Sequence, residues 1–180
     1  TPDVPEATFA KGADISWVTQ MEDDGVKFRD ADGAETECTA LMKEIGMNSI
    51  RLRVWVDPEG GWCGKEDVLV KAGRAQKLGM RIMIDFHYSD TWADPSNQKT
   101  PAAWTALSIY ELASAVETHT KETLQLLKDN KVDVEWVQVG NETNSGMLHP
   151  IGKIGSDASN FAILANKGYD AVKSVYPEAK

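Results

Sequence analysis

A strand pattern followed by a helix pattern occurs four times along the chain, and this alternation restricts the fold more than any other feature. The clearest strand, residues 49–56, reads SIRLRVWV, in which apolar residues alternate with Arg51, Arg53 and Trp55. A period of two places successive side chains on opposite faces of a strand. We therefore expect a strand with one apolar face toward helices and one face that points the arginines inward.

The other elements follow from the same kind of periodicity and from turn residues. We expect strands at residues 9–17, 49–56, 81–87 and 134–142, and helices at residues 35–46, 65–78, 108–129 and 157–174. Residues 18–34 and 88–101 contain DDG, ADG and DP turn signals and are expected to be long loops. Loops of this length usually carry function or are mobile.

Four consecutive β/α units fit two architectures, a doubly wound sheet and a barrel. A doubly wound sheet typically shows near-continuous apolar strands and often a Gly-rich first turn, whereas these strands carry polar residues at alternate positions. The pattern therefore predicts the first four β/α units of a (β/α)8 TIM barrel. A whole barrel typically needs about 250 residues, so we expect residues 1–180 to form the N-terminal half of one catalytic domain.

Composition excludes several classes of partner. The chain has 19 basic and 28 acidic residues and a net charge of −9, which disfavours nucleic acid. No apolar run approaches the roughly 20 residues of a membrane helix. The polar start TPDVPEATF fits a cytosolic protein or a trimmed secreted one, and Cys38 and Cys63 lie in no zinc-binding spacing, which leaves their redox state open.

Ionisable and polar residues gather where the expected strands end. Active sites of TIM barrels lie at the C-terminal ends of the strands. An ion-pair network without a chemical role is an equal alternative for Asp14, Arg53 and Asp85, and His87 taken alone is more often a hydrogen-bonded structural residue. The strand-end residues are Asp14, Arg51, Arg53, Trp55, Asp85, His87, Asn141 and Glu142.

Glu142 is the best candidate for a catalytic carboxyl group. It follows an otherwise apolar strand, so it must lie at the barrel mouth or be buried at high cost. Partly apolar surroundings would favour its protonated form, as proton donation to a glycosidic oxygen requires. The alternative is a helix-capping or loop glutamate.

Four segments together carry a resemblance to a known family: KGADISW, RLRVWVDPEGG, IDFHYSDTWADPSNQKTPAAW and VQVGNET. In this order they resemble the arabinogalactan endo-β-1,4-galactanases of glycoside hydrolase family 53, over nearly the whole chain from residue 9 on. IDFHYSDTWADP is highly specific, whereas a lone NE dipeptide would not be. Thr143 and His149 stand where the family pattern leads us to expect more apolar or aromatic residues.

The resemblance implies a retaining hydrolase that cleaves internal β-1,4-galactosidic bonds of galactan and arabinogalactan in plant pectin. Glu142 would be the general acid/base, Asn141 would bind the sugar 2-OH, and Arg53 would orient the nucleophile. The nucleophilic carboxylate is expected from strand seven, beyond this sequence. The implied substrate-binding residues are Asp14, Trp55, Asp85, His87, Asp90 and Trp92.

Two alternatives stay open beside the galactanase. One is a catalytically inactive half barrel that binds galactan. The other is a metal-dependent hydrolase with His87, Asp85, Asp90 and Glu142 as ligands, which the small number of histidines and the missing HxH pair disfavour.

The expected partners, cofactors and compartment follow from the same reading. We expect a polysaccharide substrate, no cofactor and no metal, with calcium confined to later loops of the family fold. The site of action would be extracellular, at the cell surface or periplasmic, because the polymer cannot enter a cell intact. A C-terminal half or self-association would have to cover the open edges of the first and fourth strands.

Overall fold

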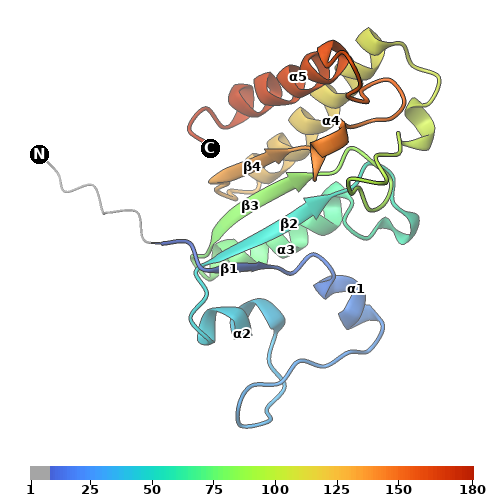
Figure 1. Cartoon of the computed structure of the whole chain (residues 1–180). Helices are drawn as coiled ribbons and strands as arrows, with labels where there is room; N and C mark the ends of the chain where they lie inside the picture. Colours follow the sequence, from blue (N-terminus) through green and yellow to red (C-terminus); the bar gives the residue numbers. More distant parts are fainter. Residues whose placement is uncertain (1–8) are drawn as a thin grey trace, which may run out of the picture.

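The computed structural model describes residues 9–180. These residues form a single parallel sheet whose strands are connected by helices (Figure 1). The strands lie side by side in chain order, β1-β2-β3-β4. In a doubly wound sheet, the order of the strands would reverse at a switch point. The strands are β1 Gly12–Asp14, β2 Ser49–Val54, β3 Arg81–Phe86 and β4 Trp136–Val139. The helices are α1 Val18–Asp23, α2 Cys38–Glu44, α3 Lys65–Lys77, α4 Ile109–Asp129 and α5 Ser159–Val175, with 3-10 turns η1 Glu59–Gly61, η2 Ala102–Trp104 and η3 Thr143–Ser145.

The apolar faces of β2 and β3 form the centre of one hydrophobic core. Ile50, Leu52 and Val54 are buried, as are their partners on β3. They belong to one cluster with Val68 of α3 and Leu112 of α4. The predicted alternation in residues 49–56 is confirmed, because Arg51 and Arg53 lie on the opposite face of β2.

Helix ends follow local rules where the sequence offers a cap. Ser108 accepts a hydrogen bond from the Glu111 amide, and the Glu111 carboxylate accepts one from the Ser108 amide, which makes a capping box at the start of α4. The Glu37 side chain accepts a hydrogen bond from the Ala40 amide. This cap begins α2 at Cys38, three residues after the predicted start.

The prediction for residues 9–34 was wrong in two respects. The strand covers only Gly12–Asp14, and residues 18–23, expected in a loop, form the short helix α1. Val18 is 2% exposed and packs in the core, so tertiary burial stabilises a segment too polar to show a helical stripe. The expected polar start at residues 1–8 lies outside the described residues.

The fourth strand is also shorter than predicted. β4 ends at Val139 because Gly140 and Glu142 both have positive φ, 93° and 49°, which no extended strand allows. The chain turns sharply there into η3. This turn, rather than a straight continuation of the strand, sets the position of Glu142.

The sheet face opposite the helices is only partly covered within residues 9–180. A hollow of about 310 Å³ runs along it and is lined by Asp14, Arg51, Met83 and Trp136, among others. On the outer edge of β4, the backbone of Lys180 already bonds to Glu135 and Val137 at 2.9 and 3.0 Å. Within these residues, no helix combines the length and apolar character needed to cross a bilayer.

Candidate active site

Arg51 joins the ends of β1, β3 and β4 on the inner face of the sheet. Its Nη1 donates to Asp14 Oδ2 at 2.8 Å, and its Nη2 donates to Asp85 Oδ2 at 2.6 Å and to Asn141 Oδ1 at 2.8 Å. Asp85 is fully buried, and its Oδ2 accepts hydrogen bonds from both Arg51 and His87. The ion-pair network expected for Asp14 and Asp85 therefore exists, but Arg51 is at its centre.

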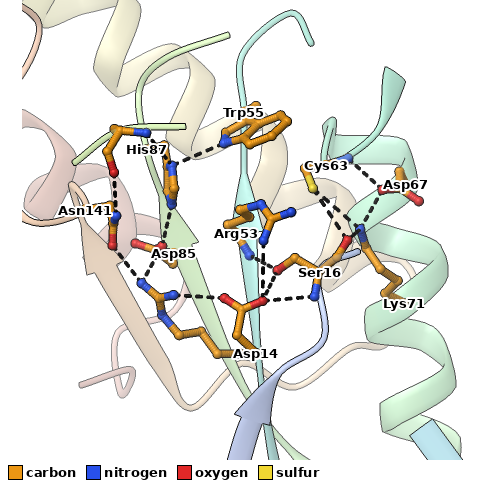
Figure 2. A network of polar contacts seen from close by, with 12 residues as sticks. Asp14, Ser16, Arg53, Trp55, Cys63, Asp67, Lys71, Asp85, His87 and Asn141 are labelled. Atoms are coloured by element: carbon orange, nitrogen blue, oxygen red, sulfur yellow. Dashed lines mark hydrogen bonds and ion pairs between the residues drawn. The ribbon is translucent and has the colours of Figure 1, made fainter. Parts of the chain in front are cut away.

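His87 is held in one tautomer by its neighbours (Figure 2). The Trp55 indole N–H and the Ala93 amide both donate to Nδ1, at 3.2 and 3.1 Å. Nδ1 must therefore be an acceptor, and Nε2 carries the proton that it donates to Asp85 Oδ2 at 2.9 Å. Both ring nitrogens are occupied, which leaves no lone pair for a metal.

Three tryptophans surround the guanidinium of Arg53. Its central carbon lies 4.1 Å from the ring centre of Trp17, 5.1 Å from Trp55 and 4.5 Å from Trp92. Arg53 is 1% exposed, and burial lowers its pKa, against the opposing effects of Cys63 and Asp14. Nε and Nη2 are buried and have no hydrogen-bond partner among residues 9–180.

Two of these tryptophans offer surface to a ligand. Trp17 and Trp92 are 44% and 45% exposed, whereas Trp55 is 7% exposed. His87 stacks on Trp92 with ring centres 5.3 Å apart, and the Arg53 guanidinium lies over the same ring. Trp92, predicted to stack on a sugar, is thus half-exposed, with its ring in contact with His87 and Arg53.

Asn141 and Glu142 lie at the end of β4 in different surroundings. Asn141 is 8% exposed; its Oδ1 accepts from Arg51, and its Nδ2 donates to the Ala93 carbonyl at 2.7 Å. One Nδ2 hydrogen remains for another acceptor. Glu142 is exposed, so the partly apolar surroundings expected for it are not supplied by residues 9–180.

Asp90 holds two loops together. Its Oδ1 accepts the Asp57 amide at 3.1 Å and its Oδ2 accepts the Ala102 amide at 2.8 Å. Both oxygens are thus used within the protein. The structure gives Asp90 a place beside the mouth, with a loop-fixing contact that the sequence did not indicate.

A buried cation ties helix α3 to the end of β1 (Figure 2). Lys71 Nζ contacts Asp67 Oδ2 at 2.5 Å and the Ser16 carbonyl at 2.8 Å. The Ser16 hydroxyl donates to Asp14 Oδ1 at 2.6 Å and accepts the Arg53 amide at 2.9 Å. Lys71 therefore supports the site from the helix layer.

Both cysteines are free thiols that lie buried in the described chain. Burial raises the pKa of Cys63, although the nearby charges of Lys71 and Arg53 oppose that change. Burial likewise raises the pKa of Cys38. Neither thiol is therefore activated as a nucleophile.

Several members of the site were not predicted from the sequence. Arg51 was expected to point inward but was given no role, although it shares the alternation that singled out Arg53. Trp17 is the last residue of the strand predicted at residues 9–17, a position that could have marked it. Gln98, whose side chain donates to the Asn141 carbonyl at 2.7 Å, lies in the loop expected at residues 88–101 but was given no role. Among residues 9–180, no three His, Cys, Asp or Glu side chains are grouped to hold a metal ion.

Parallel β/α units in chain order, with charged and aromatic side chains gathered at the strand ends, define a TIM-barrel protein. The family model of glycosyl hydrolase family 53 matches residues 10–180. The chain belongs to this family, and its fold corresponds to the N-terminal four β/α units of the family barrel.

Similar proteins agree with this membership. The chain is 41% identical to a probable arabinogalactan endo-beta-1,4-galactanase A of Aspergillus tubingensis, over 91% of this chain and 46% of that protein. It is 40% identical to an uncharacterized protein in the bgaB 5' region of Niallia circulans, over 97% of this chain and 50% of that protein. The chain spans about half the length of these relatives.

A solved structure is similar over the same extent. The family 53 catalytic domain of Ignisphaera aggregans superimposes with a TM-score of 0.91 and 38% identity, covering 98% of this chain and 52% of that chain. The predicted fold class is thereby confirmed.

Proposed function

We propose that the complete protein is a retaining endo-β-1,4-galactanase with Glu142 as general acid/base. The single observation that carries the proposal is the exposed Glu142 after the end of β4, next to Asn141, whose Oδ1 accepts a hydrogen bond from Arg51 of the charged network. Two carboxyl groups about 5 to 5.5 Å apart are required for retention. Glu142 would protonate the leaving oxygen and later deprotonate the attacking water.

The nucleophile in this proposal comes from outside residues 9–180. Asp85 is fully buried, and Asp14 accepts hydrogen bonds from Arg51 and the Ser16 hydroxyl and forms an ion pair with Arg53, so both carboxylates already serve the network. The Nε and Nη2 groups of Arg53 have no hydrogen-bond partner among the described residues. These groups fit the proposed role of orienting an incoming carboxylate.

The substrate assignment rests on sugar-binding surface and on the names of relatives. Trp92 and Trp17 are half-exposed aromatic residues, and Asn141 retains one N–H for a sugar hydroxyl. Relatives from Aspergillus are named arabinogalactan endo-beta-1,4-galactanases. We therefore propose galactan of plant pectin as substrate and an extracellular, cell-surface or periplasmic site of action.

Release of reducing ends from β-1,4-galactan tests the proposal, with xylan, mannan and cellulose as a panel. Both residues 1–180 and the longest natural chain that contains them are assayed. Glu142→Gln is expected to lower the rate on galactan by roughly 10²- to 10⁴-fold, because a positioned proton donor contributes that much.

Glu178→Gln is the matched control, since Glu178 is also exposed but lies after α5, away from the strand ends. It should retain the wild-type rate. Equal activity of the two variants would remove Glu142 from the mechanism. A folded wild type that binds galactan without cleaving it would support the binding half barrel instead.

A further inference from the structure

The loop between β3 and η2 carries a buried glutamine that contacts the end of β4. Gln98 is 3% exposed, although it lies in a segment without helix or strand. A buried amide needs partners, because an unpaired polar group in the interior is costly. Its partners are the main-chain carbonyl groups of the two residues at the end of β4.

Gln98 Nε2 donates to the Asn141 carbonyl at 2.7 Å and to the Glu142 carbonyl at 3.3 Å. Two acceptors on one side fix the orientation of the amide, since the opposite orientation would place Oε1 against both carbonyl oxygens. The amide thus spans the peptide that joins the two residues. Gln98 Oε1 has no partner among the described residues.

The position of Glu142 depends on its main chain. Its carboxyl group makes no hydrogen bond or ion pair with residues 9–180, so no polar side-chain contact there directs it. Its backbone is left-handed, with φ 49° and ψ 48°. A non-glycine residue keeps such a conformation only where its surroundings hold it.

Four further hydrogen bonds join the same two loops. Asn141 Nδ2 donates to the Ala93 carbonyl at 2.7 Å, Ser145 Oγ to the Pro95 carbonyl at 3.0 Å, the His149 amide to the Gln98 carbonyl at 2.7 Å, and Thr100 Oγ1 to the His149 carbonyl at 2.8 Å. From the loop after β3, only the Gln98 side chain donates to the carbonyl of Glu142 among the described residues. The loop after β3 therefore contacts the backbone of Glu142 through Gln98.

We propose that Gln98 is a positioning residue that holds Glu142 in its left-handed conformation at the barrel mouth. The inference rests on the proposed acid/base role of Glu142. Gln98 acts through the backbone of Glu142 and touches no reacting atom. Its loss should therefore affect the chemical step more than substrate binding.

The kinetic test compares Gln98→Met with Lys99→Met in the longest natural chain that contains residues 1–180. Methionine fills a similar volume without donating, and Lys99 is exposed, so its variant places the same side chain one position further along. Gln98→Met should lower kcat on galactan at least tenfold while KM changes less than twofold, and Lys99→Met should match the wild type. An unchanged kcat in Gln98→Met, or an equal loss in both variants, would overturn the proposal.

Gln98→Glu distinguishes a hydrogen-bonding role of this side chain from a packing role. A protonated carboxyl has one O–H to donate, whereas an ionised carboxylate would repel the two carbonyl oxygens. The activity of Gln98→Glu relative to the wild type should therefore rise as the pH falls from 7 to 4. A ratio that stays constant over this range contradicts a hydrogen-bond role.

Amide exchange separates this inference from the proposed function. The Asn144 amide donates to the Glu142 carbonyl at 2.9 Å, so its exchange reports on the same turn. In Gln98→Met it should exchange at least tenfold faster, while amides of α3 remain unchanged. Faster exchange in a protein without galactanase activity would sink the proposed function but keep the positioning role; unchanged exchange would sink the positioning role itself.

Discussion

At the scale of single residues, burial decides which ionisable groups serve the site and which serve stability. Arg53 and Asp85 are both buried; among residues 9–180, Arg53 Nε and Nη2 have no hydrogen-bond partner, whereas Asp85 Oδ2 accepts hydrogen bonds from Arg51 and His87. His119 on α4 is different, because it is surrounded by aromatic rings. Its ring centre lies 5.7 Å from Phe86 and 5.9 Å from Trp104.

We expect the titration of His119 to lower the stability of the fold in acid. Burial, assisted by the charge of Lys65, lowers its pKa from 6.5 to about 4. The unfolded chain therefore binds this proton at a higher pH than the folded chain does, so stability present above pH 6.5 is lost as the pH falls toward 4. The contribution is at most about 3 kcal/mol.

His119→Phe keeps an aromatic ring against the same neighbours and removes the titration. Urea unfolding at pH 7.5 and pH 4.5 measures the effect. The free energy of unfolding should fall less with acid in the variant than in the wild type. An identical fall in both proteins would show that His119 does not contribute.

At the scale of elements, small residues decide how closely a helix can approach the sheet. Gly168 on α5 faces β4, and an added Cβ would lie 2.5 Å from Val139 Cγ1 and 2.8 Å from Tyr88 Oη. The Tyr88 hydroxyl is itself held by Thr120 Oγ1 at 2.9 Å, so it cannot move away freely. Gly73 on α3 has no atom within 4 Å of the same position.

Alanine at these two glycines should have opposite effects. Gly168→Ala should destabilise the protein by about 1 to 3 kcal/mol, because it overpacks the contact between α5 and β4. Gly73→Ala should stabilise it by about 0.5 to 1 kcal/mol, because it only lowers the entropic cost of a helix. Thermal or urea unfolding of both variants measures these changes in stability. A Gly168→Ala protein as stable as the wild type would refute the close packing of α5 against β4.

At the scale of the whole molecule, the β1 edge and part of the inner face of the sheet are not covered by residues 9–180. Within residues 9–180, β1 pairs with β2 alone, and the hollow on the inner face is lined mainly by apolar surface such as Met83 and Trp136. Free strand edges and exposed apolar faces favour association. The solved family structure, of which this chain covers 52%, shows how much more chain a complete barrel contains.

Residues 1–180 alone should therefore self-associate in proportion to their concentration. Sedimentation velocity over a range of concentrations measures this, with the longest natural chain that contains them as the control. That longer chain should sediment as a species of constant size. A clean monomer of the 180-residue chain would contradict the expectation.

The sequence by itself determined the alternation of strands and helices and the inward direction of Arg51 and Arg53, because periods of 2 and 3.6 are local properties of the chain. Its motifs also indicated the family and placed Glu142 at the end of a strand. Element ends were less accurate, since α1 depends on the burial of Val18.

Only the tertiary structure decided how the site is held together. The central place of Arg51, the tautomer of His87 and the contact of Gln98 with Glu142 all join residues from different β/α units. Such contacts depend on the register of neighbouring strands and on the course of long loops. Neither is encoded in the periodicity of one segment, so the sequence could name the chemistry of the site but not its supports.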